Sequence, residues 1–323
     1  MQMGPITIEA HRLTKRFGAR MAAEDLSFIA RQGEVMGLLG PNGAGKTTTI
    51  RLLTTVLKPT SGQFAVAGIG PNRPNEIRRR VGVLPESAGY PQHQTGRDFL
   101  RYHARLFGLP RSDAERVAER LLVDVGLSDR ATSQISTYSR GMRQRLGIAR
   151  ALVNDPLVVL LDEPTLGLDP AGQRQVLGIL RDIAQRRGAT VVLSTHTLPE
   201  VEQVCTSVLI LDKGRVVISG SVAEVTRVVA SQMSGSLRVP IELIGKARRA
   251  LAGVPGLSVE VLDERADLLR ISLTAAAHQD HSNSGMNAAL GAVLGADIPV
   301  LSFEVDGVRL ADAFLAITRK DVT

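Results

Sequence analysis

The 323-residue sequence lacks any long apolar run, which limits what the protein can be. Its apolar runs are short, such as Leu157 to Leu161, far below the ~20 residues that span a bilayer. The first residues also lack a basic segment followed by an apolar core, so we expect no signal peptide. With 44% hydrophobic and 22% charged residues, the composition is typical of a globular protein with room for two domains.

Cysteine and lysine are both scarce. The one cysteine, Cys205, cannot form an intramolecular disulfide, which agrees with a reducing cytoplasm. Because the chain has only six lysines, arginine supplies nearly all of the net charge of +7. A basic surface could meet nucleic acid or anionic lipid, although a compositional habit of the source genome explains the charge more simply. The basic residues form small groups without a long run or tail, so we expect no nucleic-acid partner.

Residues 1 to about 230 alternate short apolar strands with helical stretches, which predicts an α/β sheet covered by helices. Three continuous apolar runs, Val35 to Leu39, Leu157 to Leu161 and Thr190 to Ser194, predict buried parallel strands. A helix is expected from near Gly45 to about Val56. The stretch from about residue 89 to 152 has apolar residues at helical spacing and no convincing strand, so it predicts an inserted helical subdomain.

A second domain is expected over residues 231–323. Apolar residues alternate with polar ones over Leu257 to Val261, Leu269 to Leu273 and Leu301 to Val305, as in half-buried strands. With helical segments between them and a further strand at Leu237 to Ile241, the order is βαββαβ, which predicts a small ferredoxin-like α+β domain.

A polar stretch of this domain contains three possible metal ligands, His278, Asp280 and His281. A solvated loop is the simpler interpretation of this stretch.

The strongest motif lies between the first buried strand and its helix. It matches G-x-x-x-x-G-K-[ST] in full, in the context that the motif requires. Its glycines let backbone N–H groups surround a phosphate, and the helix N-terminus adds partial positive charge. Lys46 can reach the β- and γ-phosphates, and the Thr47 hydroxyl is placed to bind Mg²⁺. The motif therefore predicts binding of a nucleoside triphosphate with Mg²⁺ by Gly40, Pro41, Asn42, Gly43, Ala44, Gly45, Lys46, Thr47 and the adjacent Thr48.

Further motifs follow in a fixed order. Asp162 ends an apolar strand, where its carboxylate can hold Mg²⁺, and Glu163 should point differently because strand side chains alternate. Ser139 is an N-cap candidate for a helix whose free N–H groups would form an anion site, with Gly141 allowing close approach. His196 follows the strand that ends at Ser194.

Together these motifs resemble those of the nucleotide-binding subunit of ATP-binding cassette (ABC) transporters. The resemblance implies that Glu163 polarises the attacking water and that His196 contacts the γ-phosphate. It also implies that Ser139 and Gly141 bind the γ-phosphate held by the other subunit of a head-to-tail dimer. Asp169, in a Gly-Leu-Asp-Pro segment, resembles the D-loop of the family and is also a plausible helix N-cap.

The sequence departs from the family pattern at several positions. Glu86 stands where the family usually has a glutamine, and its carboxylate can still be an oxygen ligand for Mg²⁺. The usual Leu-Ser-Gly-Gly-Gln signature is Tyr-Ser-Arg-Gly-Met here, beginning at Tyr138. Phe17 occupies the place of the aromatic ring that stacks on adenine, although a core phenylalanine is an alternative interpretation.

The resemblance implies an α/β P-loop NTPase core and an ATPase that binds ATP and Mg²⁺. It implies a homodimer or paired cassette with ATP at the interface, and a separate integral membrane permease, most simply an exporter. The protein would then be cytoplasmic and peripheral on the inner face of the cell membrane. The segment Leu310 to Thr318 resembles the end of daunorubicin-resistance-type subunits.

Two other classes are less consistent with the sequence. Soluble ABC ATPases that work on DNA or ribosomes usually carry two cassettes or a very long coiled-coil insertion, and this chain has one cassette with a short insertion. An unrelated P-loop kinase or GTPase would leave the signature segment and His196 unexplained.

Overall fold

The computed structural model describes residues 4–225, 234–255, 257–263, 268–273 and 282–305. The chain forms two compact units, Met1–Val222 and Ala223–Thr323. The histidines of the candidate metal loop and the segment Leu310 to Thr318 lie outside the described residues. None of the helices in the described part of the chain combines the length and the apolar content needed to cross a membrane.

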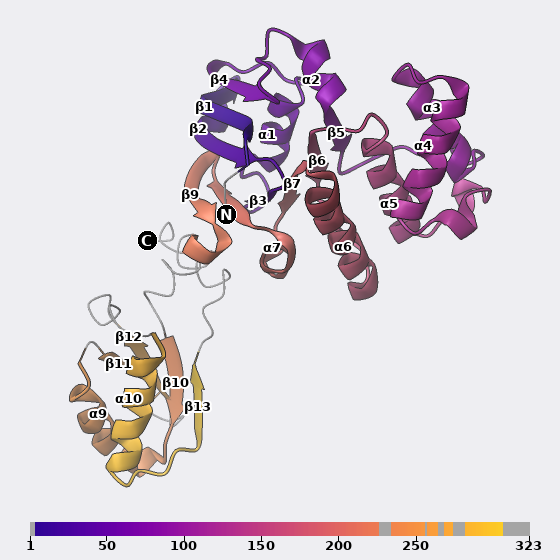
Figure 1. Ribbon diagram of the computed structural model, residues 1–323. Helices are drawn as coiled ribbons and strands as arrows, with labels where there is room; N and C mark the ends of the chain where they lie inside the picture. The colour runs from indigo at the N-terminus through magenta and orange to yellow at the C-terminus, as the bar shows by residue number, and fades with distance from the viewer. Residues whose placement is uncertain (1–3, 226–233, 256, 264–267, 274–281, 306–323) are drawn as a thin grey trace. The chain divides into compact units, whose positions relative to one another are not determined.

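A six-stranded sheet forms the centre of the first unit (Figure 1). Its strand order is β5-β6-β7-β3-β8-β9, parallel except for the antiparallel pair of β8 and β9. Every residue of β3, β6 and β7 is buried, which explains their continuous apolar runs and confirms the three predicted strands. The strand bounds are β3 Val35–Leu39, β5 Val81–Leu84, β6 Val158–Asp162, β7 Thr190–Thr195, β8 Ser207–Asp212 and β9 Arg215–Ser221.

The beginning of the chain differs from the predicted alternation of strands and helices. Strands β1 (Ile6–Phe17) and β2 (Arg20–Arg31) form a long antiparallel hairpin, and β4 (Ser61–Val66) pairs with the other edge of β1. Helix α1 (Lys46–Leu53) contacts both β2 and β6, so it packs between the two sheets. The hydrophobic core of this unit therefore runs from one sheet to the other through α1.

The predicted helical insertion follows β5. Residues 89–152 contain helices and short 3-10 turns without any strand. Helix α5 packs against β5, which is the edge strand of the six-stranded sheet, and Figure 1 shows α3 and α4 beside α5. Two further helices, α6 and α7, pack against β3 and β7. The helix bounds are α2 Pro74–Arg80, α3 Gly96–Leu106, α4 Arg111–Asp124, α5 Arg140–Ala151, α6 Pro170–Arg187 and α7 Leu198–Val204.

The described residues of the second unit form a four-stranded antiparallel sheet and the two helices α9 and α10. The order along the chain is the predicted βαββαβ, and the strand order in the sheet is β11-β12-β10-β13. The first strand was predicted at Leu237 to Ile241 but ends at Arg238, since Pro240 has no N–H for the ladder. The ferredoxin-like assignment stays a prediction. The bounds are β10 Ser234–Arg238, α9 Ile244–Ala252, β11 Leu257–Asp263, β12 Leu268–Leu273, α10 Ser282–Gly295 and β13 Ser302–Val305.

Candidate nucleotide-binding site

The phosphate loop connects the end of β3 to the start of α1. A Cβ atom at Gly40 would lie 2.4 Å from the carbonyl oxygen of Leu211, so the loop cannot accept a side chain there. Gly45 precedes the helix with a left-handed φ of 105°, and a Cβ atom there would lie 2.5 Å from the carbonyl oxygen of Ala22. The neighbouring backbone therefore requires glycine at both positions, and the loop stays narrow enough to surround a phosphate.

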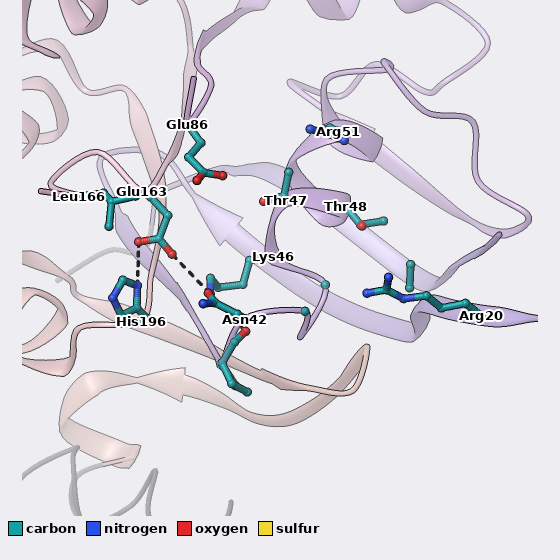
Figure 2. A pocket seen from close by; sticks show the side chains of 14 residues that line it. Arg20, Asn42, Lys46, Thr47, Thr48, Arg51, Glu86, Glu163, Leu166 and His196 are labelled. Atoms are coloured by element: carbon teal, nitrogen blue, oxygen red, sulfur yellow. Dashed lines mark hydrogen bonds and ion pairs between the residues drawn. The ribbon is translucent and has the colours of Figure 1, made fainter. Parts of the chain in front are cut away.

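Glu163 lies between Lys46 and His196, the two residues that are expected to act with it (Figure 2). Its Oε1 is 3.4 Å from the Lys46 Nζ, and its Oε2 is 3.0 Å from the His196 Nδ1. The Lys46 ammonium also donates to the carbonyl oxygen of Gly40 at 2.7 Å. The side chains of Lys46 and Glu163 are only 7% and 10% exposed, whereas that of His196 is 49% exposed. The structure thus joins three predicted catalytic residues that are far apart in sequence.

Asp162 and Glu163 point in different directions, as predicted, but the physical reason differs from strand alternation. Strand β6 ends at Asp162, and Glu163 adopts a left-handed φ of 49°, which turns its side chain toward the phosphate loop. The Ser194 hydroxyl donates to the Asp162 Oδ1 at 2.5 Å and accepts from the Glu163 N–H at 2.9 Å. Ser194 therefore holds both acidic residues, a role that the sequence analysis did not assign to it.

An open cavity of about 570 Å³ covers the phosphate loop. Its lining includes Glu86 and most of the predicted phosphate-binding residues, while Gly40, Ala44 and Asp162 do not line it. Two cationic side chains that the sequence analysis missed, Arg20 and Arg51, also belong to the lining. The lining residues are Arg20, Ala22, Pro41, Asn42, Gly43, Gly45, Lys46, Thr47, Thr48, Arg51, Glu86, Glu163, Leu166 and His196.

Sequence signals for these two arginines existed. Arg51 is four residues after Thr47, so both lie on one face of α1. The turn at Gly18 pairs Arg20 with Phe17 across the β1–β2 hairpin. Figure 2 shows Arg20 at the opposite side of the cavity from His196.

Phe17 is not a core residue, so that alternative was wrong. It is 47% exposed, and the Lys15 Nζ lies 5.0 Å from the centre of its ring. Its pairing with Arg20 places it next to a residue that lines the cavity. Stacking on adenine stays a prediction, because Phe17 itself is absent from the lining.

The signature segment and the D-loop segment meet at a second cavity of about 370 Å³. Ser139 caps α5 and accepts from the Met142 N–H at 3.2 Å, and Asp169 caps α6 and accepts from the Gly172 N–H at 3.2 Å. Ser139, Gly141 and Asp169 all line this cavity, which shares no lining residue with the phosphate-loop cavity. The phosphate-loop cavity and the signature cavity are therefore separate within one chain.

The comparisons with known proteins agree with this geometry. The family model described as "ABC transporter" matches residues 23–166. The linearmycin resistance ATP-binding protein LnrL of Bacillus subtilis is 30% identical over 319 residues, which is 96% of this chain and 98% of LnrL. The chain belongs to the ATP-binding proteins of the ABC transporter family. Its P-loop fold and its ATPase activity follow from this membership.

Two further members of the ABC transporter family extend the comparison. The bacitracin transport ATP-binding protein BcrA of Bacillus licheniformis is 39% identical over 210 residues, covering 64% of this chain and 67% of BcrA. A solved ATP-binding subunit of an ABC transporter is 32% identical, with a TM-score of 0.61, and the match covers 68% of this chain and 92% of that one. The relatives are thus ATP-binding proteins of resistance and transport systems.

Proposed function

We propose that two copies of this protein pair head to tail and hydrolyse ATP between them to power a separate export permease. Within one chain the phosphate-loop cavity and the cavity at Ser139 share no lining residue, and this separation carries the proposal. The capped N-terminus of α5 offers free backbone N–H groups to an anion, but it lines a different cavity from Lys46. In a head-to-tail pair, the signature segment of one copy would meet the γ-phosphate bound by the other.

The groups around Glu163 support its role as the proton acceptor for the attacking water. His196 holds one carboxylate oxygen, and Lys46 shares the other with the carbonyl oxygen of Gly40. When Lys46 turns to the β- and γ-phosphates, the Oε1 of Glu163 becomes available to accept a proton from water. The proton then stays on the carboxyl group until it exchanges with solvent.

Magnesium would be held by the Thr47 hydroxyl together with the carboxylates of Glu86 and Asp162. Thr47 and Glu86 line the phosphate-loop cavity, and oxygen donors of this kind suit Mg²⁺. Among the described residues, no group of three His, Cys, Asp or Glu side chains is close enough to form a metal site by itself. Phosphate oxygens of the nucleotide would complete the coordination, and the metal would supply charge neutralisation.

The permease is expected to dock on the helical insertion. Tyr102, Leu106 and Phe107 are 55%, 64% and 46% exposed at the end of α3, which is unusual for large apolar side chains so close in sequence. Leu106 and Phe107 also line a groove of about 590 Å³. Docking there would hold the protein on the inner face of the cell membrane. Export fits the printed name of a further relative, the Nod factor export ATP-binding protein I of Burkholderia lata, which is 38% identical over 215 residues. The resemblance of the segment Leu310 to Thr318 favours the daunorubicin-resistance branch of the family.

Purification of the tagged protein from detergent-solubilised membranes tests this proposal. An integral membrane protein should accompany the wild-type protein, and the double variant Tyr102→Ser, Phe107→Ser should lose it while keeping its basal ATPase activity. Purification with nucleic acid or ribosomes instead would contradict the transport function and favour the soluble class of ABC ATPases.

A further inference from the structure

Ser194 and Thr195 at the end of β7, and His196 directly after it, direct their side chains to three different acidic residues. Ser194 contacts Asp162 on the neighbouring strand β6, and His196 contacts Glu163 in the cavity. Thr195, between them, contacts Glu200 on α7 instead. The proposed function uses the first two contacts and gives the third no role.

The contact between Thr195 and Glu200 is part of a buried hydrogen-bond relay. The Thr195 hydroxyl donates to the Glu200 Oε2 at 2.8 Å and accepts from the Thr197 N–H at 3.0 Å. Thr195 is completely buried, and Glu200 is only 5% exposed. A buried carboxylate costs folding free energy unless it is hydrogen-bonded. Loss of this contact would therefore leave the Glu200 carboxylate buried without its donor, which is strongly unfavourable.

An ordinary helix cap does not explain this arrangement. In a capping box, the acidic residue at the third helical position accepts directly from the N–H of the N-cap residue. Here Glu200 occupies that position of α7 and Thr197 is the N-cap, but the Thr195 hydroxyl stands between them. The relay therefore connects the residues on both sides of His196 and restrains the backbone that carries the imidazole.

Helix α7, which carries Glu200, is packed tightly on the sheet. A Cβ atom at Gly37 on β3 would lie 3.0 Å from the Cys205 Sγ and 3.1 Å from a methyl group of Val201, so α7 and the residue after it pack tightly on the central sheet. Burial raises the pKa of the Cys205 thiol, and the nearby charge of Glu200 raises it further. Glu200 thus lies on a helix that packs closely against the central sheet.

We propose that Glu200 is a positioning residue for His196. Through the Thr195 hydroxyl it fixes the loop so that the imidazole reaches the carboxylate of Glu163. The proposal rests on the role of His196 in turnover that is part of the proposed function. Glu200 does not line the cavity, and its carboxylate accepts from Thr195, so its effect on turnover passes through His196.

Variants can interrupt the relay at two different places. Glu200→Ala removes the acceptor, and Thr195→Val removes the hydroxyl with little change in volume. Glu200→Gln and Thr195→Ser keep the hydrogen-bonding groups and should restore wild-type behaviour. Glu202→Ala is the matched control, because Glu202 is an exposed carboxylate on the same helix.

Two measurements report on the relay. We expect kcat for ATP to fall about tenfold or more in Glu200→Ala and Thr195→Val with KM unchanged, since a misplacement of ~1 Å can cost ~100-fold in rate. The side-chain NMR signal of His196, assigned as the signal missing from His196→Ala, should shift in both variants and stay unchanged in Glu202→Ala. If Glu200→Ala does not fold, as judged by thermal unfolding, Thr195→Val carries the same test.

The two readouts separate this inference from the proposed function. An unshifted His196 signal in the relay variants, or a raised KM with unchanged kcat, would overturn the positioning role of Glu200. A shifted signal combined with wild-type turnover in His196→Ala would instead refute the role of His196 and leave the relay intact.

Discussion

Replacing Glu163 by glutamine tests the chemistry of the site most directly. The amide keeps the shape of the side chain, so it can still contact His196, which lies 3.0 Å from one carboxylate oxygen. The substitution removes the negative charge beside Lys46 and the basic oxygen that would take a proton from water. We therefore expect hydrolysis to fail while the nucleotide still binds.

The expected loss can be stated in numbers. Removal of a general base typically costs ~10²–10⁴ in rate, which corresponds to about 2.7 to 5.4 kcal/mol in the activation free energy. ATP affinity should not weaken, since Lys46 loses a competing carboxylate and remains free to bind the phosphates. Because the bound ATP persists, the paired form should accumulate.

Three assays measure these effects on the purified protein. Phosphate release gives the steady-state rate, calorimetry gives the ATP affinity, and size-exclusion chromatography with light scattering gives the mass with and without ATP. The control is Glu202→Gln, which makes the same change at an exposed carboxylate, and its rate, ATP affinity and mass should match those of the wild type. If Glu163→Gln turns over ATP at more than about a tenth of the wild-type rate, the loss is too small for a general base and Glu163 does not have this role.

Three other predictions test different parts of the chain. Lys46→Ala should lose hydrolysis and weaken ATP binding in calorimetry, because it removes the cation that neutralises the phosphates; an unchanged affinity would contradict the phosphate-loop assignment. Ser139→Arg should still bind ATP but fail to form the dimer, because a bulky cation replaces a small hydrogen-bonding group. Its mixture with Lys46→Ala should dimerise on ATP, since one site of the mixed dimer keeps both Lys46 and Ser139; dimerisation of Ser139→Arg alone would refute the head-to-tail arrangement. Burial, with the charge of Arg150, lowers the pKa of His103 to about 4. The folded state therefore binds this proton less tightly than the unfolded chain, so stability should fall as the pH drops from about 6.5 to 4, and His103→Gln should show a smaller drop in thermal midpoint.

Much of the first unit was predictable because its signals are local. Strands β3 and β6 show as the continuous apolar runs Val35 to Leu39 and Leu157 to Leu161, and the hairpin of β8 and β9 is joined by a short polar turn at Lys213 and Gly214. The long hairpin at the N-terminus was missed. Its strands show register shifts at several points, so the alternation of buried and exposed residues is broken along β1 and the period-two signal is weak.

The sequence by itself determined the phosphate loop, the two helix caps at Ser139 and Asp169, and membership of the family. The loop and the caps each depend on residues that are close in sequence, and the family follows from the fixed order of several such motifs along the chain, so the sequence is enough to specify them. Only the tertiary structure decided which groups meet. Asp162 and Ser194 are 32 residues apart in the chain and contact each other because β6 and β7 pair in register. The left-handed turn of Glu163 and the burial of Glu200 against Thr195 likewise depend on packing between elements, which no local pattern records.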